Sequence, residues 1–261
     1  MTKSHIGQFA CYQTGDIVCG KISKLGTWEV DATNALRPFM GPSTVFVDVG
    51  SNVGWYTFTM ARTHDVVAYE PFEKNLKLQA VTRCLQPALA RRIELHGHGL
   101  SNKNQTCDLY QVLGVNEGDT HSVCDETKRK AMLMDRTYHY QKLGTASLRL
   151  LDDVASPSLF AAEKVMKVDI EGHEYEMLRG ADRFLSQGSP PKALFVEVFQ
   201  LAAKKPLLDQ FLLAKGYSAR PVGGGQNVLY VRAGEHARRG VQNQQQHADA
   251  PVRPHIRGPH F

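Results

Sequence analysis

Short apolar runs alternate with amphipathic segments through the middle of the chain. Runs rich in Val, Ile, Leu and Phe, without a polar face, are typical of strands buried on both sides. Such runs occupy residues 45–48, 66–71, 93–100, 165–170, 192–198 and 227–233. Helical patterns between them occupy residues 53–62, 72–85, 174–185 and 207–215. This alternation predicts an α/β fold, with a doubly wound, mostly parallel sheet covered by helices on both faces.

The remaining segments lack this alternation. Residues 1–42 are mixed, with Gly and Pro punctuation, and we expect them to form an extension packed on or near the active site. Residues 43–233 hold the main domain. Within it, residues 101–146 are polar, which predicts an irregular, solvated insert. Residues 234–261 are rich in Gln, Pro and His, so we expect a disordered tail.

The composition is that of an ordinary globular protein. The chain has 261 residues, of which 42% are hydrophobic and 22% charged, enough for one large domain or two small ones. No apolar run approaches the ~20 residues that a membrane helix needs. The first residues lack the charged start and apolar core of a signal peptide. We therefore expect a cytoplasmic protein that has no membrane partner.

Charge and cysteine content exclude further classes. The formal net charge is +5, but the basic residues form no clustered stripe, so nucleic acid is not an expected partner. The cysteines are five, an odd number, and no two of them have C-x-x-C spacing. We expect free thiols in a reducing compartment rather than disulfides or a zinc site.

The first strand ends in an aspartate that is followed by two glycines. Ligands of parallel sheets bind beyond the carboxyl ends of the strands, so DVGSNVG, from Asp48 to Gly54, is a candidate cofactor loop. Gly50 permits a sharp turn, and Gly54 lets the next helix begin close to the strand. Asn52 stands where the dinucleotide fingerprint needs a glycine, and no phosphate-loop lysine follows. These features favour S-adenosylmethionine, which has no phosphate to bind.

The second strand supplies a matching acidic residue. Glu70 ends this strand, 22 residues after Asp48. An acidic residue about 20 positions after a glycine loop is typical of sites that bind a ribose diol. A carboxylate can accept a hydrogen bond from each hydroxyl of the diol, and its charge strengthens both bonds. The loop and Glu70 together therefore predict a nucleoside-type cofactor.

The fourth strand leads into KVDIEGHEYEMLRGA, residues 167–181. With FVDVGSNVGWYT, AYEP and LDD in this order, the run resembles the FkbM-type family of S-adenosylmethionine-dependent methyltransferases. The resemblance covers roughly residues 28–232, although 103–146 match poorly. It implies the seven-stranded class I methyltransferase sheet (Rossmann-like), with the last strand antiparallel. It also implies O-methylation of a hydroxyl on a small molecule or a glycan.

Position and resemblance together give the expected site residues. Asp169 ends the fourth strand, facing the transferred methyl group, and we expect it to act as a base or to orient the acceptor. Glu171 and His173 are further catalytic candidates, whereas Glu174 is at least as well suited to cap a helix start. Ser101 or Asn102 could meet the adenine amino group. The expected cofactor-binding residues are Asp48, Gly50, Ser51, Asn52, Gly54, Glu70, Ser101 and Asp169.

Four alternatives stay open. One is a nucleic-acid methyltransferase, which is disfavoured because no D/N-P-P-Y/F motif follows the fourth strand and the basic residues form no stripe. Asp169 and Glu197 should end neighbouring strands, where two carboxylates could hold a divalent cation that lowers the pKa of the acceptor. A catalytically inactive fold could serve as an interaction module, although the presence of Asp48, Glu70 and Asp169 argues against it. A nicotinamide-dependent oxidoreductase is disfavoured by Asn52.

Overall fold

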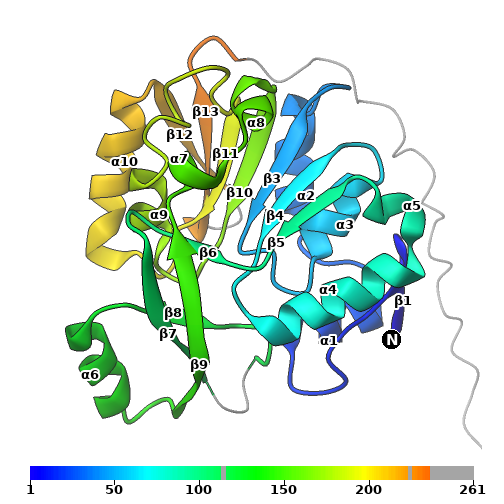
Figure 1. The fold of residues 1–261 in the computed structure, drawn as a ribbon, viewed down its shortest axis with the longest axis vertical. Coiled ribbons are helices and arrows are strands. Elements are labelled where there is room, and N and C mark those ends of the chain that lie inside the picture. Colours follow the sequence, from blue (N-terminus) through cyan, green and yellow to red (C-terminus); the bar gives the residue numbers. More distant parts are fainter. Residues whose placement is uncertain (113–115, 223–224, 236–261) are drawn as a thin grey trace, which may run out of the picture.

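A mixed sheet of seven strands forms the centre of the molecule (Figure 1). The computed structural model describes residues 1–112, 116–222 and 225–235. From edge to edge the strands are β12 (Tyr217–Val222), β13 (Asn227–Arg232), β11 (Ala193–Glu197), β10 (Lys164–Val168), β3 (Val45–Val49), β4 (Val66–Tyr69) and β5 (Ile93–His96). Neighbouring strands from β11 to β5 are parallel. The last strand, β13, is antiparallel to both of its neighbours, as expected.

Helices cover both faces of this sheet. Successive residues of a strand point to opposite faces. Phe46 of β3 lies in an apolar cluster with residues of α1 (Ile17–Leu25), α2 (Val30–Leu36) and α3 (Trp55–Ala61). Val47, the next residue, lies in a second cluster with residues of α9 (Glu174–Arg179) and α10 (Lys205–Ala214). Burial on both faces explains why the central strands are continuous apolar runs in the sequence.

The strand order reverses between β3 and β10. From β3 the chain proceeds outward to β4 and β5, and it later returns to place β10 on the other side of β3. The carboxyl ends of these two strands flank the point of reversal, which is where ligands of open α/β sheets bind. The segments that follow β3, β4 and β10 are therefore positioned to build a site.

A second sheet corrects the expectation of an irregular insert at residues 101–146. Its strands, in spatial order, are β6 (Gly99–Leu100), β9 (Tyr140–Arg149), β7 (Gln105–Val112) and β8 (His121–Val123). Helix α6 (Glu126–Met134) follows β8 and lies at the outer end of this sheet (Figure 1). Leu109 of β7 and Leu148 of β9 are buried in a cluster with Phe72. Most positions of β9 are exposed, so its apolar signal was too weak to predict a strand.

Two predicted elements have different boundaries in the structure. The predicted strand at 93–100 divides into β5 in the main sheet and β6 in the second sheet. At Gly99, a β-carbon would collide with the side chain of Leu148, so glycine permits this close pairing. The predicted helix at 174–185 ends as a regular α-helix at Arg179. The next residue, Gly180, lies against the backbone carbonyl of Ser101, where a β-carbon would not fit.

Several further elements have weak sequence signals and were not predicted. Residues 218–221 of β12 are all exposed, so this strand lacks an apolar run.

Helix α4, in contrast, agrees with the predicted helix at 72–85 and spans Glu73–Leu85. The remaining elements are short: β1 (Thr2–Ser4), β2 (Gly7–Phe9), η1 (Arg37–Phe39), α5 (Pro87–Ala90), α7 (Leu151–Val154), α8 (Pro157–Ala161) and η2 (Ala202–Lys204).

The cysteines correct a second expectation. Cys11 is bonded to Cys19, with 5.4 Å between their Cα atoms, and Cys107 is bonded to Cys124, with 4.5 Å. Cys84 is free and exposed. The predicted set of free thiols is therefore wrong for four of the five residues. The pairs are 8 and 17 residues apart in sequence, and only the fold brings them together. Such disulfides are typical of proteins that fold in an oxidising compartment.

Two further expectations concerned a membrane-spanning segment and the C-terminal tail. Within the described ranges, no helix combines the length and the apolar character needed to cross a membrane. The tail that we expected to be disordered lies outside the described residues from 236 onward.

Candidate active site

A cavity lies beyond the carboxyl ends of β3, β4 and β10. It encloses about 620 Å³, part of which is open to solvent. The second sheet and the residues just before its strand β8 contribute to its wall, through Gly99, Leu100, residues 118–120, Ser122 and Leu148. The residues predicted from the sequence that line it are Gly50, Asn52, Glu70, Asp169, Glu171 and His173. The structure thus brings three separate sequence motifs to one cavity.

Gly50 lets the loop after β3 touch the segment after β10. Its φ is 78°, in the left-handed region that favours glycine. A β-carbon at this position would collide with the backbone carbonyl oxygen of Asp169 and lie 2.7 Å from the side chain of Ile170. The Gly50 N–H donates a 3.0 Å hydrogen bond to the carbonyl of Tyr69 at the end of β4. One glycine therefore holds three strand ends together.

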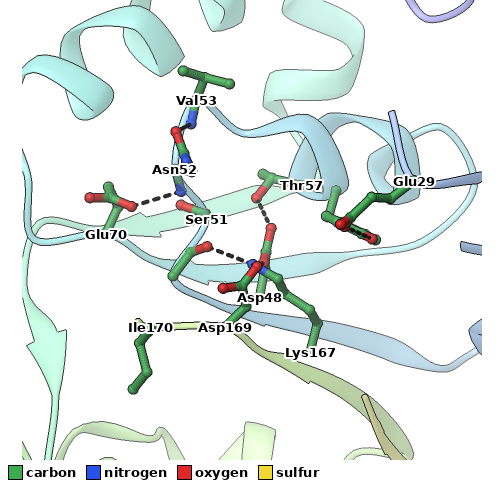
Figure 2. A network of polar contacts seen from close by, with 12 residues as sticks. Glu29, Asp48, Ser51, Asn52, Val53, Thr57, Glu70, Lys167, Asp169 and Ile170 are labelled. Carbon is green, nitrogen blue, oxygen red and sulfur yellow. Dashed lines mark hydrogen bonds and ion pairs between the residues drawn. The ribbon is translucent and has the colours of Figure 1, made fainter. Parts of the chain in front are cut away.

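Glu70 is held in place by backbone groups of the loops beside it. Its carboxylate accepts a 2.7 Å hydrogen bond from the N–H of Asn52 (Figure 2) and a 2.8 Å bond from the N–H of Phe72. Asn52 has a φ of 52°. The Glu70 side chain is almost fully buried, and this burial raises its pKa to about 7. Each oxygen keeps a further lone pair, so a hydroxyl in the cavity can still be bound.

Lys167 is a buried cation beneath this loop. Its Nζ donates a 2.7 Å hydrogen bond to the carbonyl of Gly50. The same nitrogen lies 3.4 Å from Asp169 Oδ2 and 3.6 Å from Asp48 Oδ1 (Figure 2). Asp48 is completely buried and accepts a 2.6 Å hydrogen bond from Thr57. Asp48 therefore supports the loop from below and does not reach the cavity wall, contrary to its expected role in cofactor binding.

Three other residues expected to bind the cofactor also lie off the wall. The Ser51 hydroxyl accepts a 2.7 Å hydrogen bond from Gln79, which holds the loop against α4. Gly54 precedes α3 with a φ of 92°, so its role is to start the helix. The Ser101 hydroxyl is fully buried, 2.9 Å from His173 Nε2. These side chains shape the loops that carry the wall.

The carboxylates after β10 differ in their surroundings. The Asp169 side chain is 32% exposed and pairs with Lys167, so it is the accessible and charge-paired member. Glu171 has a φ of 57° and accepts a hydrogen bond from Gln200. Burial, followed by the negative charges of Asp169 and Asp119, raises the pKa of Glu171 to about 11. Of the two, Asp169 is the one better placed to contact an acceptor in the cavity.

His173 and Glu174 serve mainly to hold the segment. Burial lowers the pKa of His173 to about 4, so its ring is neutral at physiological pH. Its Nε2 lies within hydrogen-bonding distance of Ser101. Glu174 accepts hydrogen bonds from the N–H groups of Ile170, at 2.9 Å, and Gly172, at 3.1 Å. It therefore holds the loop before α9, the capping function that its position allowed.

Asp169 and Glu197 do follow neighbouring strands. In the parallel pairing of β10 with β11, Val168 lies opposite Val196, so the two acids come next at equivalent positions. Only Asp169 lies on the cavity wall. Burial and the charge of Asp169 raise the pKa of Glu197 to about 8. Within the part of the chain that the structure describes, Glu197 Oε2 is a buried oxygen that has no hydrogen-bond partner.

The second sheet adds residues that the sequence did not indicate. Asp119, Thr120 and Ser122 line the cavity. Asp119, His121 and Glu171 each present a potential ligand atom, and these atoms lie within 4.8 Å of one another. The available signal was an aspartate and a histidine two residues apart, Asp119 and His121. It was missed because the surrounding polar sequence predicted a solvated insert.

The N-terminal segment contacts the same region. Asp16 accepts a 2.6 Å hydrogen bond from the N–H of Cys19, which caps α1, and a 2.8 Å bond from the N–H of Gly118 on the cavity wall. The Tyr12 hydroxyl donates a 2.8 Å hydrogen bond to Asn75, which in turn donates to the carbonyl of Gly118 at 3.0 Å. These bonds fix the strip of wall that the second sheet contributes.

Comparisons with known proteins agree with the resemblance seen in the motifs. Residues 48–219 match the model of the methyltransferase FkbM domain. Methyltransferase 1 of Beauveria bassiana (strain ARSEF 2860) is 26% identical over 170 residues, which are 59% of this chain and 64% of the relative. The chain thus spans less than two thirds of the length of that curated relative.

Solved structures similar to this chain include other methyltransferases. Methyltransferase FkbM from Methylobacillus flagellatus KT has 22% sequence identity and a TM-score of 0.49, over 74% of this chain and 44% of that one. An S-adenosylmethionine-dependent methyltransferase from Aquifex aeolicus has 11% identity and a TM-score of 0.39, over 77% of this chain and 88% of that one. The family match covers most of the chain and contains the glycine loop, Glu70 and Asp169. This chain belongs to the FkbM family of methyltransferases.

Proposed function

We propose that the protein transfers the methyl group of S-adenosylmethionine to a hydroxyl of a small molecule or a glycan. The observation that carries this proposal is the shared cavity of Gly50, Asn52, Glu70 and Asp169 at the point where the strand order reverses. Family membership supports methyl transfer. The choice of a hydroxyl acceptor rests on the carboxylates that line the cavity, since they can accept the proton that a hydroxyl loses.

The residues around the cavity fit the chemical groups of this cofactor. The Glu70 carboxylate keeps lone pairs that a ribose diol can use, as a nucleoside cofactor requires. The loop at Gly50 leaves no side chain between the backbone and the cavity. When bound, S-adenosylmethionine supplies a methyl carbon activated by its sulfonium. The protein's own contribution is to align the acceptor and to exclude water.

Asp169 is the residue that we assign to the acceptor. Its carboxylate is partly exposed on the cavity wall, while Lys167 compensates its charge from below. An ionised carboxylate can orient a hydroxyl and take up its proton. The buried Glu171, with its raised pKa, is protonated at neutral pH and is less suited to this role.

Calorimetric titration tests the cofactor assignment. We expect the purified protein to bind S-adenosylmethionine and S-adenosylhomocysteine and not NAD. Glu70→Gln keeps the side-chain shape but removes the charged acceptor, which should weaken binding by about 1–3 kcal/mol. Glu73→Gln is the matched control, because the Glu73 side chain is 78% exposed and pairs with the exposed Lys77. Absence of S-adenosylmethionine binding to the folded wild-type protein would refute the proposed function.

A further inference from the structure

Three side chains with metal-ligating atoms meet where the second sheet touches the segment after β10. Asp119 comes just before β8, His121 is the first residue of β8, and Glu171 follows β10. Their ligand atoms lie within 4.8 Å of one another. We infer that Asp119, His121 and Glu171 form a binding site for a divalent transition-metal ion on the cavity wall. This set differs from the pair of Asp169 and Glu197 that the sequence suggested.

The distances allow a single ion to bind all three side chains. An ion about 2.1 Å from nitrogen and oxygen ligands spans at most about 4.2 Å between two of them. The three atoms therefore need to approach one another by only about half an ångström, which a small side-chain rotation supplies. Asp119 and His121 are two residues apart in sequence, and Asp119 Oδ1 lies 3.8 Å from His121 Nε2.

The polar atoms of the cluster have unused binding capacity. The His121 residue is only 9% exposed, and its Nε2 lies 3.8 Å from Asp119 Oδ1, too far for a hydrogen bond. Asp119 Oδ1 is itself buried and has no hydrogen-bond partner within the described residues. A buried polar atom without a partner costs free energy unless a ligand satisfies it. A cation between these atoms would satisfy both.

The charge balance points to a cation as well. In the described ranges, no lysine or arginine nitrogen lies within 4.0 Å of the Asp119 or Glu171 carboxylates. The neighbouring acids Asp48 and Asp169 differ, because Lys167 lies 3.6 Å and 3.4 Å from them. Glu171 accepts a hydrogen bond from the neutral amide of Gln200 and is hydrogen-bonded to Asp119. The cluster thus gathers two carboxyl groups that have no lysine or arginine beside them within the described residues.

The donor set selects the class of ion. One imidazole and two carboxylates suit Mn²⁺, Fe²⁺ or Zn²⁺, whereas Mg²⁺ and Ca²⁺ prefer oxygen ligands alone. Asp119 and Glu171 both line the cavity, so further coordination positions of the ion would face the space for the acceptor. Three protein ligands with an open position are typical of catalytic rather than structural ions.

The role of the ion rests on the proposed function, although its binding does not. An ion here would lower the pKa of an acceptor hydroxyl that it contacts. The hydroxyl proton would pass to the Asp169 carboxylate. The oxygen lone pair would then form the bond to the methyl carbon, and the electron pair of the breaking carbon–sulfur bond would stay on sulfur. Both carboxylates and the ion remain unchanged in oxidation state.

Mn²⁺ binding to the full chain tests the site directly. We expect calorimetry to give one tight Mn²⁺ per chain in the wild-type protein. His121→Asn and Glu171→Gln, prepared separately, should each weaken this binding by at least about tenfold. Glu197→Gln is the matched control, because it removes a nearby carboxylate outside the cluster. Its Mn²⁺ affinity should stay within about twofold of the wild-type value.

A spectroscopic measurement keeps the test independent of how the variants fold. Electron spin echo modulation of Mn²⁺ bound to the wild-type protein should detect the coupling of one imidazole nitrogen, and His121→Asn should remove it. No tight Mn²⁺ in the wild-type protein, or bound Mn²⁺ without this nitrogen, would overturn the proposed site. Loss of binding in Glu197→Gln alone would also overturn it. S-adenosylmethionine affinity, measured on the same samples, reports the proposed function separately.

Discussion

Lys167 and Asp169, two residues apart on the same strand end, form an ion pair in which Nζ lies 3.4 Å from Oδ2. The lysine side chain is only 4% exposed. Because the same Nζ also donates to the Gly50 carbonyl at 2.7 Å, one buried cation connects the segment after β10 to the loop after β3. A charged side chain within an apolar strand needs such a partner, because its burial would otherwise cost free energy.

Replacing this cation should destabilise the protein strongly. Lys167→Met has a similar length but leaves Asp48 and Asp169 without their counter-charge. Breaking a buried pair in this way costs about 3–5 kcal/mol, which urea denaturation would measure as a loss of free energy of unfolding. Lys77→Met is the control, because the Lys77 side chain is 71% exposed and pairs with the exposed Glu73. A Lys167→Met protein as stable as this control would contradict the structural role.

The glycine loop offers a sharper comparison. Gly50→Ala should abolish S-adenosylmethionine binding or folding, since its β-carbon would collide with the Asp169 carbonyl and its φ is 78°. Gly20→Ala is the matched control: Gly20 lies within α1, and nothing lies within 4 Å of an added β-carbon. Alanine there should raise the free energy of unfolding by about 0.5–1 kcal/mol. Equal affinity and thermal stability in the two variants would show that the loop has room to adjust.

The sequence predicted those parts of the molecule that are buried on both sides. Strands β3, β4, β10 and β11 are continuous apolar runs, and the acids at their ends could be located from this pattern alone. Gly50, Glu70 and Asp169, which this pattern marked as candidate site residues, all line the cavity. The pattern could not show that the Asp48 side chain would be buried below the loop rather than exposed to the cavity. A residue near the end of a strand can have either orientation.

The parts that escaped prediction have polar surfaces or depend on long-range contacts. His121 begins β8 of the second sheet and Asp119 lies two residues before it, in a polar segment that predicted no strand. Asp16 reaches Gly118 across 102 positions of sequence. The disulfide of Cys107 with Cys124 likewise depends on the pairing of β7 with β8. Such contacts leave no local pattern from which they could be read.

The disulfides can be checked by counting thiols. Unfolded protein that has not been reduced should react with Ellman's reagent at one cysteine, Cys84, and fully reduced protein at all five. Reduction should also lower the melting temperature, because closing a loop of about 15 residues restricts the unfolded chain by about 3 kcal/mol. Cys84→Ser is the control and should leave the melting temperature unchanged. Five reactive thiols before reduction would restore the expectation drawn from the sequence.

Stability should fall as the pH rises from about 6.5 to 8. Burial raises the pKa of Glu70 and of Glu174 to about 7, above the value of about 4.3 in an unfolded chain. The folded state therefore binds more protons than the unfolded state in this window, and the free energy of unfolding decreases with pH. His173, with a folded pKa of about 4, acts in the opposite direction only below about 6.5.

Urea denaturation at several pH values would measure this slope. Glu70→Gln does not titrate, so its free energy of unfolding should depend less steeply on pH than that of the wild-type protein. Glu73→Gln should keep the wild-type slope, because the Glu73 side chain is exposed. A stability that rises with pH in this window, or equal slopes for all three proteins, would show that the buried carboxyls do not titrate as expected.

Asp169→Asn separates the possible roles of the acid on the cavity wall. The amide keeps the shape but cannot take up a proton, so turnover on a hydroxyl acceptor, identified by screening with a labelled methyl donor, should fall by about 10²–10⁴-fold. Lys167 keeps Asp48 and the Gly50 carbonyl as partners. S-adenosylmethionine affinity and melting temperature should therefore change little.

The pattern of these three measurements decides between the roles. If Asp169 only held the loop, affinity, melting temperature and turnover would fall together. Asp182→Asn is the control, because the Asp182 side chain is 60% exposed, pairs with Lys215 and lies away from the cavity wall; all three of its values should match the wild-type protein. Full turnover by the Asp169→Asn variant would refute the assignment of the base. The proton would then have to leave through another group on the wall, and Asp119 would be the next carboxylate to replace.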